Sequence, residues 1–365
     1  FVWHGLFLSV FTPWGLRQTN VTSIRSIPDS FRPGIIAMYG TVQPGQHEIN
    51  MFRKSEKMFR RDPIPVSRRE RRRLIRSSSD KSQEKLEEVI DFRDSASDSR
   101  PKRWTSLISE RPFVVDAVSR KLFDNESARL WEVEGHPGLL VITDALSYKS
   151  QLYWIQRALN FYSKSPYTNL WSPGQPIPSL WDDVIASNNT DNFKKLRWAN
   201  VGRHYDWTAR EYIPVDNMPD LQPELVDLFK EAVSIVGLNV PSMAQAGIVN
   251  FYPSGSCMGG HVDDAEEDMS SPIVSLSLGC SGVYLQGGQS RAQTPTPLWL
   301  KSGDVMIMSG PARLCYHGVP LVTSNTLPQP LMDQIDASSD QALKQYISAA
   351  RINFNLRAVD CPIPG

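Results

Sequence analysis

Hydrophobic residues recur along this chain with two different spacings, and each spacing predicts one type of element. Apolar positions three and four apart predict helices over residues 148–161 and 223–236. Short alternating or wholly apolar runs predict strands over residues 138–143, 247–252, 272–278, 283–286, 298–301, 305–309 and 350–357. Many short strands separated by glycine and proline are typical of a sandwich or jelly roll. The expected fold class is therefore α+β, with a double-stranded β-helix (jelly roll) core and supporting helices.

Long stretches without this periodicity divide the chain into regions. Residues 77–103 are rich in serine and charged residues and have little to bury. We therefore expect residues 1–103 to be mostly disordered, apart from a short docking turn near residues 86–90. The folded domain is expected to cover residues 130–360. Within it, residues 163–220 are rich in tryptophan, proline and asparagine, and long irregular segments of compact domains are usually functional or disordered.

The charge distribution singles out one basic segment. The 365 residues carry 39 basic and 39 acidic side chains, so attraction to phosphate has to come from a local patch. Residues 51–76 hold eleven Lys or Arg against three Asp or Glu, which is a local excess of eight. This basic segment is typical either of phosphate contact or of a nuclear-import signal. A solvated, partly helical tail explains it equally well.

The remaining composition restricts the class of protein. The apolar residues 1–14 are too few to cross a bilayer as a helix, so we expect no membrane partner, and Met38 is a candidate start residue. The four cysteines lack a C-x-x-C spacing, which argues against a zinc knuckle and fits a reducing compartment. We expect an intracellular protein, with nucleus, cytoplasm and mitochondrion all open, and a monomer.

The pair His261 and Asp263, followed much later by His317, is the pattern that points most directly to chemistry. Residues two apart in a strand point to the same face, so one short segment offers two ligands. The third ligand has to come from another strand. Two imidazoles and one carboxylate are the ligand set of a non-haem Fe(II) oxygenase, which leaves coordination positions open.

The last predicted strand alternates sharply between apolar and polar residues. Ile352, Phe354 and Leu356 share one face, and the other face carries Arg351, Asn353, Asn355 and Arg357. An inward arginine is a suitable anchor for a dicarboxylate because its guanidinium group binds a carboxylate bidentately. Asn250 and Tyr252, again two apart, could donate neutral hydrogen bonds to the same small molecule. Such an alternating strand is, taken alone, more often a solvated sheet face.

Together these motifs resemble the AlkB family of Fe(II)- and 2-oxoglutarate-dependent nucleic-acid dioxygenases. Asn250-Phe-Tyr252 is similar to the family's N-x-Y, His261-Val-Asp263 to its H-x-D, and His317 to its distal histidine. The segment from Arg351 to Arg357 is similar to its R-x-N-x-T-x-R. The resemblance covers residues 137–357 and is strongest to the eukaryotic branch represented by the first AlkB homologue.

The resemblance implies a role for each matching residue. His261, Asp263 and His317 would hold Fe(II), with Asp263 the catalytic carboxylate. Arg351 would pair with the distal carboxylate of 2-oxoglutarate, and O2 would be the second co-substrate. The rest of the co-substrate pocket would be formed by Asn250, Tyr252, Asn353 and Arg357. The chain departs from the family at Asn355, where a threonine is usual, and at Ala265, where some relatives carry an acid that reads the base; Glu266 is the candidate substitute.

The resemblance also makes residues 163–220 a nucleotide-recognition lid. Aromatic rings can stack on an extruded base, so Trp198, Tyr205 and Trp207 are candidate substrate-binding residues. The simpler interpretation is that most of these aromatic side chains belong to the core.

The expected function is oxidation or removal of methyl groups on nucleic acid. N1-methyladenine or 5-methylcytosine in tRNA is the first substrate that the resemblance implies, and N6-methyladenine in DNA is the second. Two alternatives stay open. The same iron site could demethylate or hydroxylate a protein such as a histone, or the chain could be a non-catalytic nucleic-acid-binding adaptor.

Overall fold

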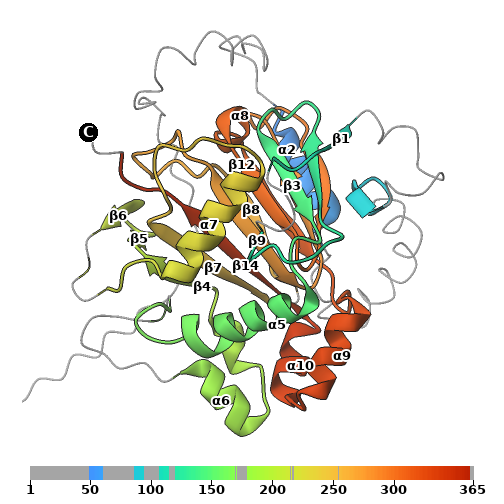
Figure 1. Cartoon of the computed structure of the whole chain (residues 1–365), viewed down its shortest axis with the longest axis vertical. Helices are drawn as coiled ribbons and strands as arrows, with labels where there is room; N and C mark the ends of the chain where they lie inside the picture. Colours follow the sequence, from blue (N-terminus) through green and yellow to red (C-terminus); the bar gives the residue numbers. More distant parts are fainter. Residues whose placement is uncertain are drawn as a thin grey trace, which may run out of the picture. The chain divides into compact units, whose positions relative to one another are not determined.

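Two antiparallel sheets form the centre of the protein in the computed structural model (Figure 1). The structure describes residues 49–60, 86–93, 107–114, 120–168, 170, 179–213, 215, 218–253 and 255–361, all within one compact unit that spans residues 46–365. The larger sheet has, in spatial order, β1 (Ile108–Arg111), β2 (Arg129–Val133), β3 (Leu139–Thr143), β12 (Val305–Met308), β9 (Ile273–Gly279), β14 (Ala350–Arg357), β7 (Ala246–Pro253) and β4 (Trp198–Gly202). The smaller sheet has β11 (Thr296–Leu300), β10 (Gly282–Gln286), β13 (His317–Val322) and β8 (Met258–His261).

Helices cover the outer face of the larger sheet (Figure 1). They are α5 (Tyr148–Arg157) with its continuation η3 (Ala158–Tyr162), α7 (Pro223–Ile235), α9 (Gln329–Ala337) and α10 (Gln341–Ile347). Ile352, Phe354 and Leu356 of β14 are buried against these helices, as the alternation of the sequence predicts. In β12, Val305 and Ile307 face the helices and the two methionines face the smaller sheet. This strand is therefore buried on both faces, as expected from its wholly apolar sequence.

The apolar layer between the sheets is joined at one end by polar side chains. Tyr284, Leu298 and Val319 of the smaller sheet pack against Tyr252 and Met306 of the larger one. Ser275, Ser277, Asn353 and Arg351 lie on the inner face of the larger sheet and are also buried. Because a buried polar group requires a partner, this concentration of polar side chains marks the interior where a ligand is expected.

The jelly-roll fold and the helices over residues 148–161 and 223–236 are confirmed. In the region up to residue 103, the structure describes a helix that the expectation of disorder did not include, and it confirms the docking turn near residues 86–90. Helix α2 (Met51–Phe59) packs on the outer face of the smaller sheet, where Phe52 is completely buried, and Ile90 forms a bridge to Leu298 of β11. Residues 1–48, 61–85 and 94–103, with most of the basic segment, lie outside the described residues.

Five elements lie where the sequence showed little periodicity. Residues 163–220 contain α6 (Leu180–Ser187), the short 3-10 helix η4 (Asn192–Lys195), β4 and the hairpin formed by β5 (His204–Asp206) and β6 (Glu211–Ile213).

Among the described residues, no helix combines the length and the apolar character needed to cross a membrane.

Candidate metal and co-substrate site

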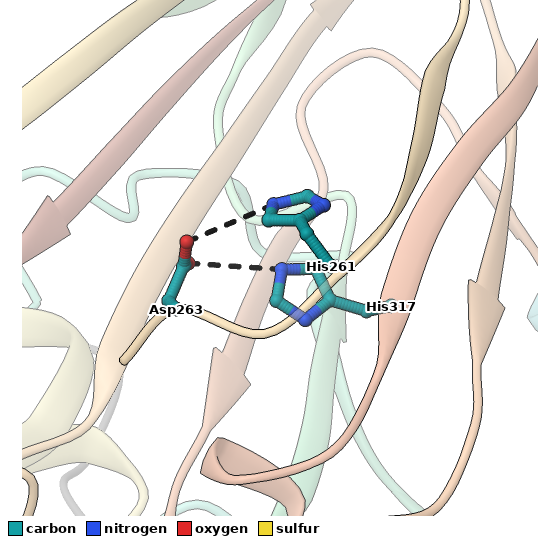
Figure 2. Close-up of side chains that lie close together, drawn as sticks. All are labelled: His261, Asp263 and His317. Carbon is teal, nitrogen blue, oxygen red and sulfur yellow. Dashed lines mark ion pairs between the residues drawn. The ribbon is translucent and has the colours of Figure 1, made fainter. Parts of the chain in front are cut away.

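The side chains of His261, Asp263 and His317 converge at one end of the smaller sheet (Figure 2). His261 is the last residue of β8, and His317, the first residue of β13, lies directly opposite it in the antiparallel pair. Nε2 of His261 is 3.7 Å from Oδ1 of Asp263, and Nε2 of His317 is 3.7 Å from Oδ2. The sequence suggested that strand alternation brings His261 and Asp263 together. Asp263 instead lies in the loop just beyond β8, so alternation within the strand does not explain its position.

Both imidazoles are held in the orientation that a metal ligand requires. Nδ1 of His261 donates to the carbonyl of Gly259 at 2.9 Å, and Nδ1 of His317 donates to the carbonyl of Cys315 at 3.2 Å. A carbonyl can only accept, so each Nδ1 carries the proton and each Nε2 directs its lone pair at Asp263. Burial, with a smaller effect of His261, lowers the pKa of His317 to about 4, which keeps its ring neutral at physiological pH.

The carboxylate completes a set of donors that fits a divalent cation. Burial alone raises the pKa of Asp263, but Arg357 and the two histidines lower it far below its usual range, so the group is ionised. Its buried Oδ2 accepts no hydrogen bond, although Nη1 of Arg357 lies 3.2 Å away. The three ligand atoms lie within 4.8 Å of one another. Neighbouring ligands of an octahedral ion, each about 2.1 Å from it, are about 3 Å apart, so small shifts would close this site on a metal.

A buried arginine without an acidic partner lies beside this centre. Arg351 is 2% exposed, and its Nη2 donates to Oγ of Ser277 at 2.8 Å. Its Nε and Nη1 make no hydrogen bond, and no acidic side chain of the described residues forms an ion pair with it. Burial lowers the pKa of Arg351, with Tyr252 and Asp304 opposing the shift. An isolated buried charge is strongly unfavourable, so this guanidinium fits an anionic ligand.

The other predicted co-substrate residues surround this arginine. Tyr252 lies opposite Arg351 in the β7–β14 pair, with the guanidinium 5.3 Å from the centre of its ring. Asn250 lies opposite Asn353, whose amide donates to Ser275 at 2.8 Å. The sequence motifs therefore come together across three neighbouring strands, β7, β14 and β9.

Arg357 and Glu266 take part in a buried charge network rather than facing a ligand freely. Nη1 of Arg357 is 2.9 Å from Oε1 of Glu266, and Oε2 of Glu266 accepts from Nη2 of Arg313 at 2.9 Å. Arg313 also donates to the main-chain carbonyl of Asp263. The hydroxyl of Tyr212 donates to Oε1 of Glu266 at 3.0 Å. The Nε of Arg357 makes no hydrogen bond, which leaves one donor for the co-substrate.

This network changes the interpretation of Glu266. Its carboxylate is 1% exposed and both oxygens already accept hydrogen bonds from the protein. The sequence suggested that Glu266 replaces an acid that reads the base. Glu266 lines the cleft shared by Asp263 and the β5–β6 hairpin, so that role stays a prediction; its contacts in addition link the loop of Asp263 to Tyr212 of the hairpin.

A cleft of about 310 Å3 is lined by residues of the candidate metal site and by residues of this hairpin. Its lining includes His261 and Asp263 together with Tyr205, Trp207 and Tyr212. The Tyr205 and Trp207 rings pack edge to face with their centres 4.9 Å apart, and Trp207 is 46% exposed. Trp198 does not line the cleft but packs against Trp207, with the centres of the two rings 4.9 Å apart.

Three residues of the site carried no signal that identified their role. Ser277 holds Arg351, but serine alternating with leucine predicts only a strand. Arg313 comes from the one-turn helix α8 (Gly310–Arg313), where nothing nearby in sequence marks it. Tyr212 was visible among the aromatic residues of the lid, and only the hairpin register brings it to Glu266.

The fold and the site together define an Fe(II)- and 2-oxoglutarate-dependent oxygenase, and comparison with known proteins agrees. Residues 138–357 match the model of the 2OG-Fe(II) oxygenase superfamily. The DNA N(6)-methyladenine demethylase ALKBH1A of Arabidopsis thaliana is 32% identical over 64% of this chain and 79% of its own length. The tRNA demethylase abh1 of Schizosaccharomyces pombe is 32% identical over 63% of this chain and 82% of its own.

The chain belongs to the AlkB family of this superfamily, and its similarity is to the ALKBH1 group. A solved structure of OsALKBH1 aligns with 61% of this chain and 97% of its own at 23% identity, with a TM-score of 0.45. The family model and the relatives confirm the resemblance seen in the sequence motifs, and the protein is an enzyme whose family uses Fe(II), 2-oxoglutarate and O2.

Proposed function

We propose that this enzyme oxidises methyl groups on the bases of nucleic acid, with methylated tRNA as its first substrate and DNA as its second. The cleft carries this proposal, because two of the proposed metal ligands and the rings of Tyr205, Trp207 and Tyr212 line it together. Aromatic rings compensate a base for the neighbours that it loses when it leaves a helix. Relatives named as a tRNA demethylase and a DNA N(6)-methyladenine demethylase support the substrate class.

Each side chain then has a defined task in the proposed reaction. His261, Asp263 and His317 bind Fe(II), and the Nδ1 bonds to main-chain carbonyls keep both Nε2 atoms aimed at the ion. Arg357 holds the Asp263 carboxylate through an ion pair to Oδ2. Arg351 has no acidic partner among the described residues, and it pairs with the distal carboxylate of 2-oxoglutarate.

When bound, iron would allow O2 to oxidise 2-oxoglutarate and a substrate C–H bond together: one oxygen atom enters succinate as CO2 is lost, and the other enters the C–H bond as a hydroxyl group. A hydroxylated N-methyl group then loses formaldehyde and leaves the bare nitrogen. A hydroxylated C-methyl group stays attached because its carbon–carbon bond does not break in this way. The enzyme would therefore remove methyl groups from nitrogen but only oxidise those on carbon.

The test compares three substrates in one assay. Native tRNA carrying N1-methyladenine and 5-methylcytosine, DNA carrying N6-methyladenine, and methylated histone are each incubated with enzyme, Fe(II) and 2-oxoglutarate. Succinate is measured, and nucleosides or peptides are analysed by mass spectrometry. We expect N1-methyladenine to fall in tRNA with an equal yield of formaldehyde. Succinate formation with histone alone would replace this proposal by a protein demethylase.

Two variants separate the metal site from its surroundings. Asp263→Ala removes one ligand and is expected to abolish succinate formation with tRNA. Glu267→Ala changes an exposed acid four residues away and is expected to keep the parent rate. If Asp263→Ala couples 2-oxoglutarate to tRNA oxidation at the original rate, the metal assignment is wrong. A protein that retains no iron and turns over no 2-oxoglutarate would instead be an adaptor.

A further inference from the structure

The strand that presents His261 is short and lies at the edge of its sheet. Strand β8 has four residues and pairs only with β13, and this pairing is interrupted by a register shift between His317 and Val319. An edge strand leaves one row of backbone groups without a neighbouring strand, so such strands are easily deformed unless something covers them.

Side chains from outside the sheet occupy this open edge at Gly260, the residue directly before His261. The Gly260 N–H donates to Oε1 of Glu56 in α2 at 2.5 Å. The Gly260 carbonyl accepts from Nη2 of Arg291 at 2.8 Å. Both backbone groups that β8 turns away from β13 are therefore satisfied at this position, one of them by a residue of α2.

Close packing holds α2 in this place. Phe52 is completely buried, and a Cβ atom at Gly260 would lie 2.4 Å from its ring. The Phe52 N–H donates to the carbonyl of Arg291 at 3.0 Å, which joins the two groups that hold Gly260. At the other end of α2, Nη2 of Arg60 donates to Sγ of Cys257, just before β8 begins.

The same contacts reach the second histidine. The ring of Phe52 is 6.3 Å from that of Tyr316, and the guanidinium of Arg291 lies 4.6 Å from the centre of the Tyr316 ring. Tyr316 directly precedes His317. Helix α2 and Arg291 therefore contact the residue before each of the two histidines.

We propose that α2 is a positioning element of the metal centre, with Glu56 as its positioning residue. This inference rests on the proposed role of His261 as a metal ligand. The Gly260 peptide joins His261 to Gly259, whose carbonyl orients the His261 ring. Rotation of that peptide would displace both the ring and its hydrogen-bond acceptor, so Glu56 restrains the imidazole although it does not contact it.

The experiment measures the affinity of the metal-free protein for Mn(II) by titration calorimetry with 2-oxoglutarate present. Glu56→Ala removes the acceptor and is expected to weaken Mn(II) binding roughly 10- to 100-fold, the usual effect of losing an orienting contact behind a ligand. Glu56→Gln keeps an oxygen that accepts from Gly260 and is expected to bind Mn(II) like the parent. Lys54→Ala changes an exposed residue of the same helix and serves as the matched control.

The outcomes separate this inference from the proposed function. If Glu56→Ala binds Mn(II) as tightly as the parent, even with a lowered melting temperature, α2 is only structural and the inference is wrong. If His261→Ala binds Mn(II) like the parent, the metal assignment itself is wrong. Should Glu56→Ala fail to fold, Arg291→Met removes the contact to the Gly260 carbonyl and is expected to weaken Mn(II) binding in the same way; unchanged binding overturns the inference.

Discussion

Replacing Glu266 with glutamine tests the buried charge network most directly. Glu266 and Arg313 are each 1% exposed at their side chains, and Arg357 is 4% exposed. Glutamine keeps the shape and one acceptor oxygen but removes the negative charge and turns an amide donor toward a guanidinium. Arg313 then has only the Asp263 carbonyl and the sulfur of Met269 as acceptors.

The size of the effect follows from the burial of these groups. Removing one partner of a buried ion pair costs about 3–5 kcal/mol, and Arg357 keeps Asp263 as a partner, so we expect the lower end, about 3 kcal/mol. At ~2–4 °C per kcal/mol for a protein somewhat smaller than this one, the melting temperature should fall by roughly 6–12 °C. Urea unfolding of the metal-free protein gives the free energy, and calorimetry gives the melting temperature.

The pH dependence of this loss has a definite sign. Burial alone raises the pKa of Glu266, but Arg357 and Arg313 more than offset it and hold the pKa below the usual 4.5. A carboxyl group with a depressed pKa stabilises the fold above its unfolded pKa and loses that contribution as the pH falls through its folded pKa. The difference between parent and Glu266→Gln should therefore be full at pH 7 and shrink in acid well below pH 4.5.

A matched control and a clear contrary result complete this test. Glu267→Gln changes the exposed neighbouring acid and is expected to alter the free energy of unfolding by less than about 0.5 kcal/mol. If Glu266→Gln is as stable as the parent while the KM for nucleic acid rises, Glu266 contacts the base and the positioning role is wrong.

Three further predictions concern His136, Arg351 and Trp207. Burial lowers the pKa of His136 to about 4 from 6.5, so the folded protein excludes a proton that the unfolded chain binds. The parent should therefore lose about 3 kcal/mol more stability than His136→Gln between pH 7 and pH 4 in urea unfolding; equal losses would contradict this. Arg351→Met removes the cation proposed to bind 2-oxoglutarate and should raise the KM for 2-oxoglutarate by about 100-fold or more, while Mn(II) affinity without co-substrate stays near that of the parent. An unchanged KM would place the anion elsewhere. Trp207→Ala should raise the KM for tRNA by roughly 5- to 100-fold, the range for one lost stacking contact, and an equal rise in the KM for 2-oxoglutarate would show a collapsed site instead.

The sequence predicted those parts of the site that depend on local alternation. The strand from Arg351 to Arg357 has its apolar face against the helices and its polar face inward, as its period of two requires. The prediction was less accurate where a residue depends on a loop, because Asp263 lies beyond the end of β8. Its position comes from the contacts of Arg313 and Arg357, which are 50 and 94 residues away, and no local pattern encodes them.

The N-terminal part of the domain shows a second limit of pattern analysis. Helix α2 begins a basic segment, and this charge favours a solvated tail. Two phenylalanines at its ends decide the outcome because Phe52 fits against glycines at 260 and 287, where a side chain would collide with the ring. That fit depends on residues more than 200 positions away, so it could not be seen in the sequence of the segment itself.

The guanidinium of Arg351, which has no acidic partner among the described residues, has a consequence for the stability of the protein in a cell. A ligand that binds only the native state shifts the unfolding equilibrium by mass action. Because the keto acid supplies the counter-ion that the polypeptide lacks, metabolic depletion of that acid would leave molecules that are inactive and have a lower free energy of unfolding. Abundance of the enzyme would then follow the supply of its co-substrate without any change in transcription.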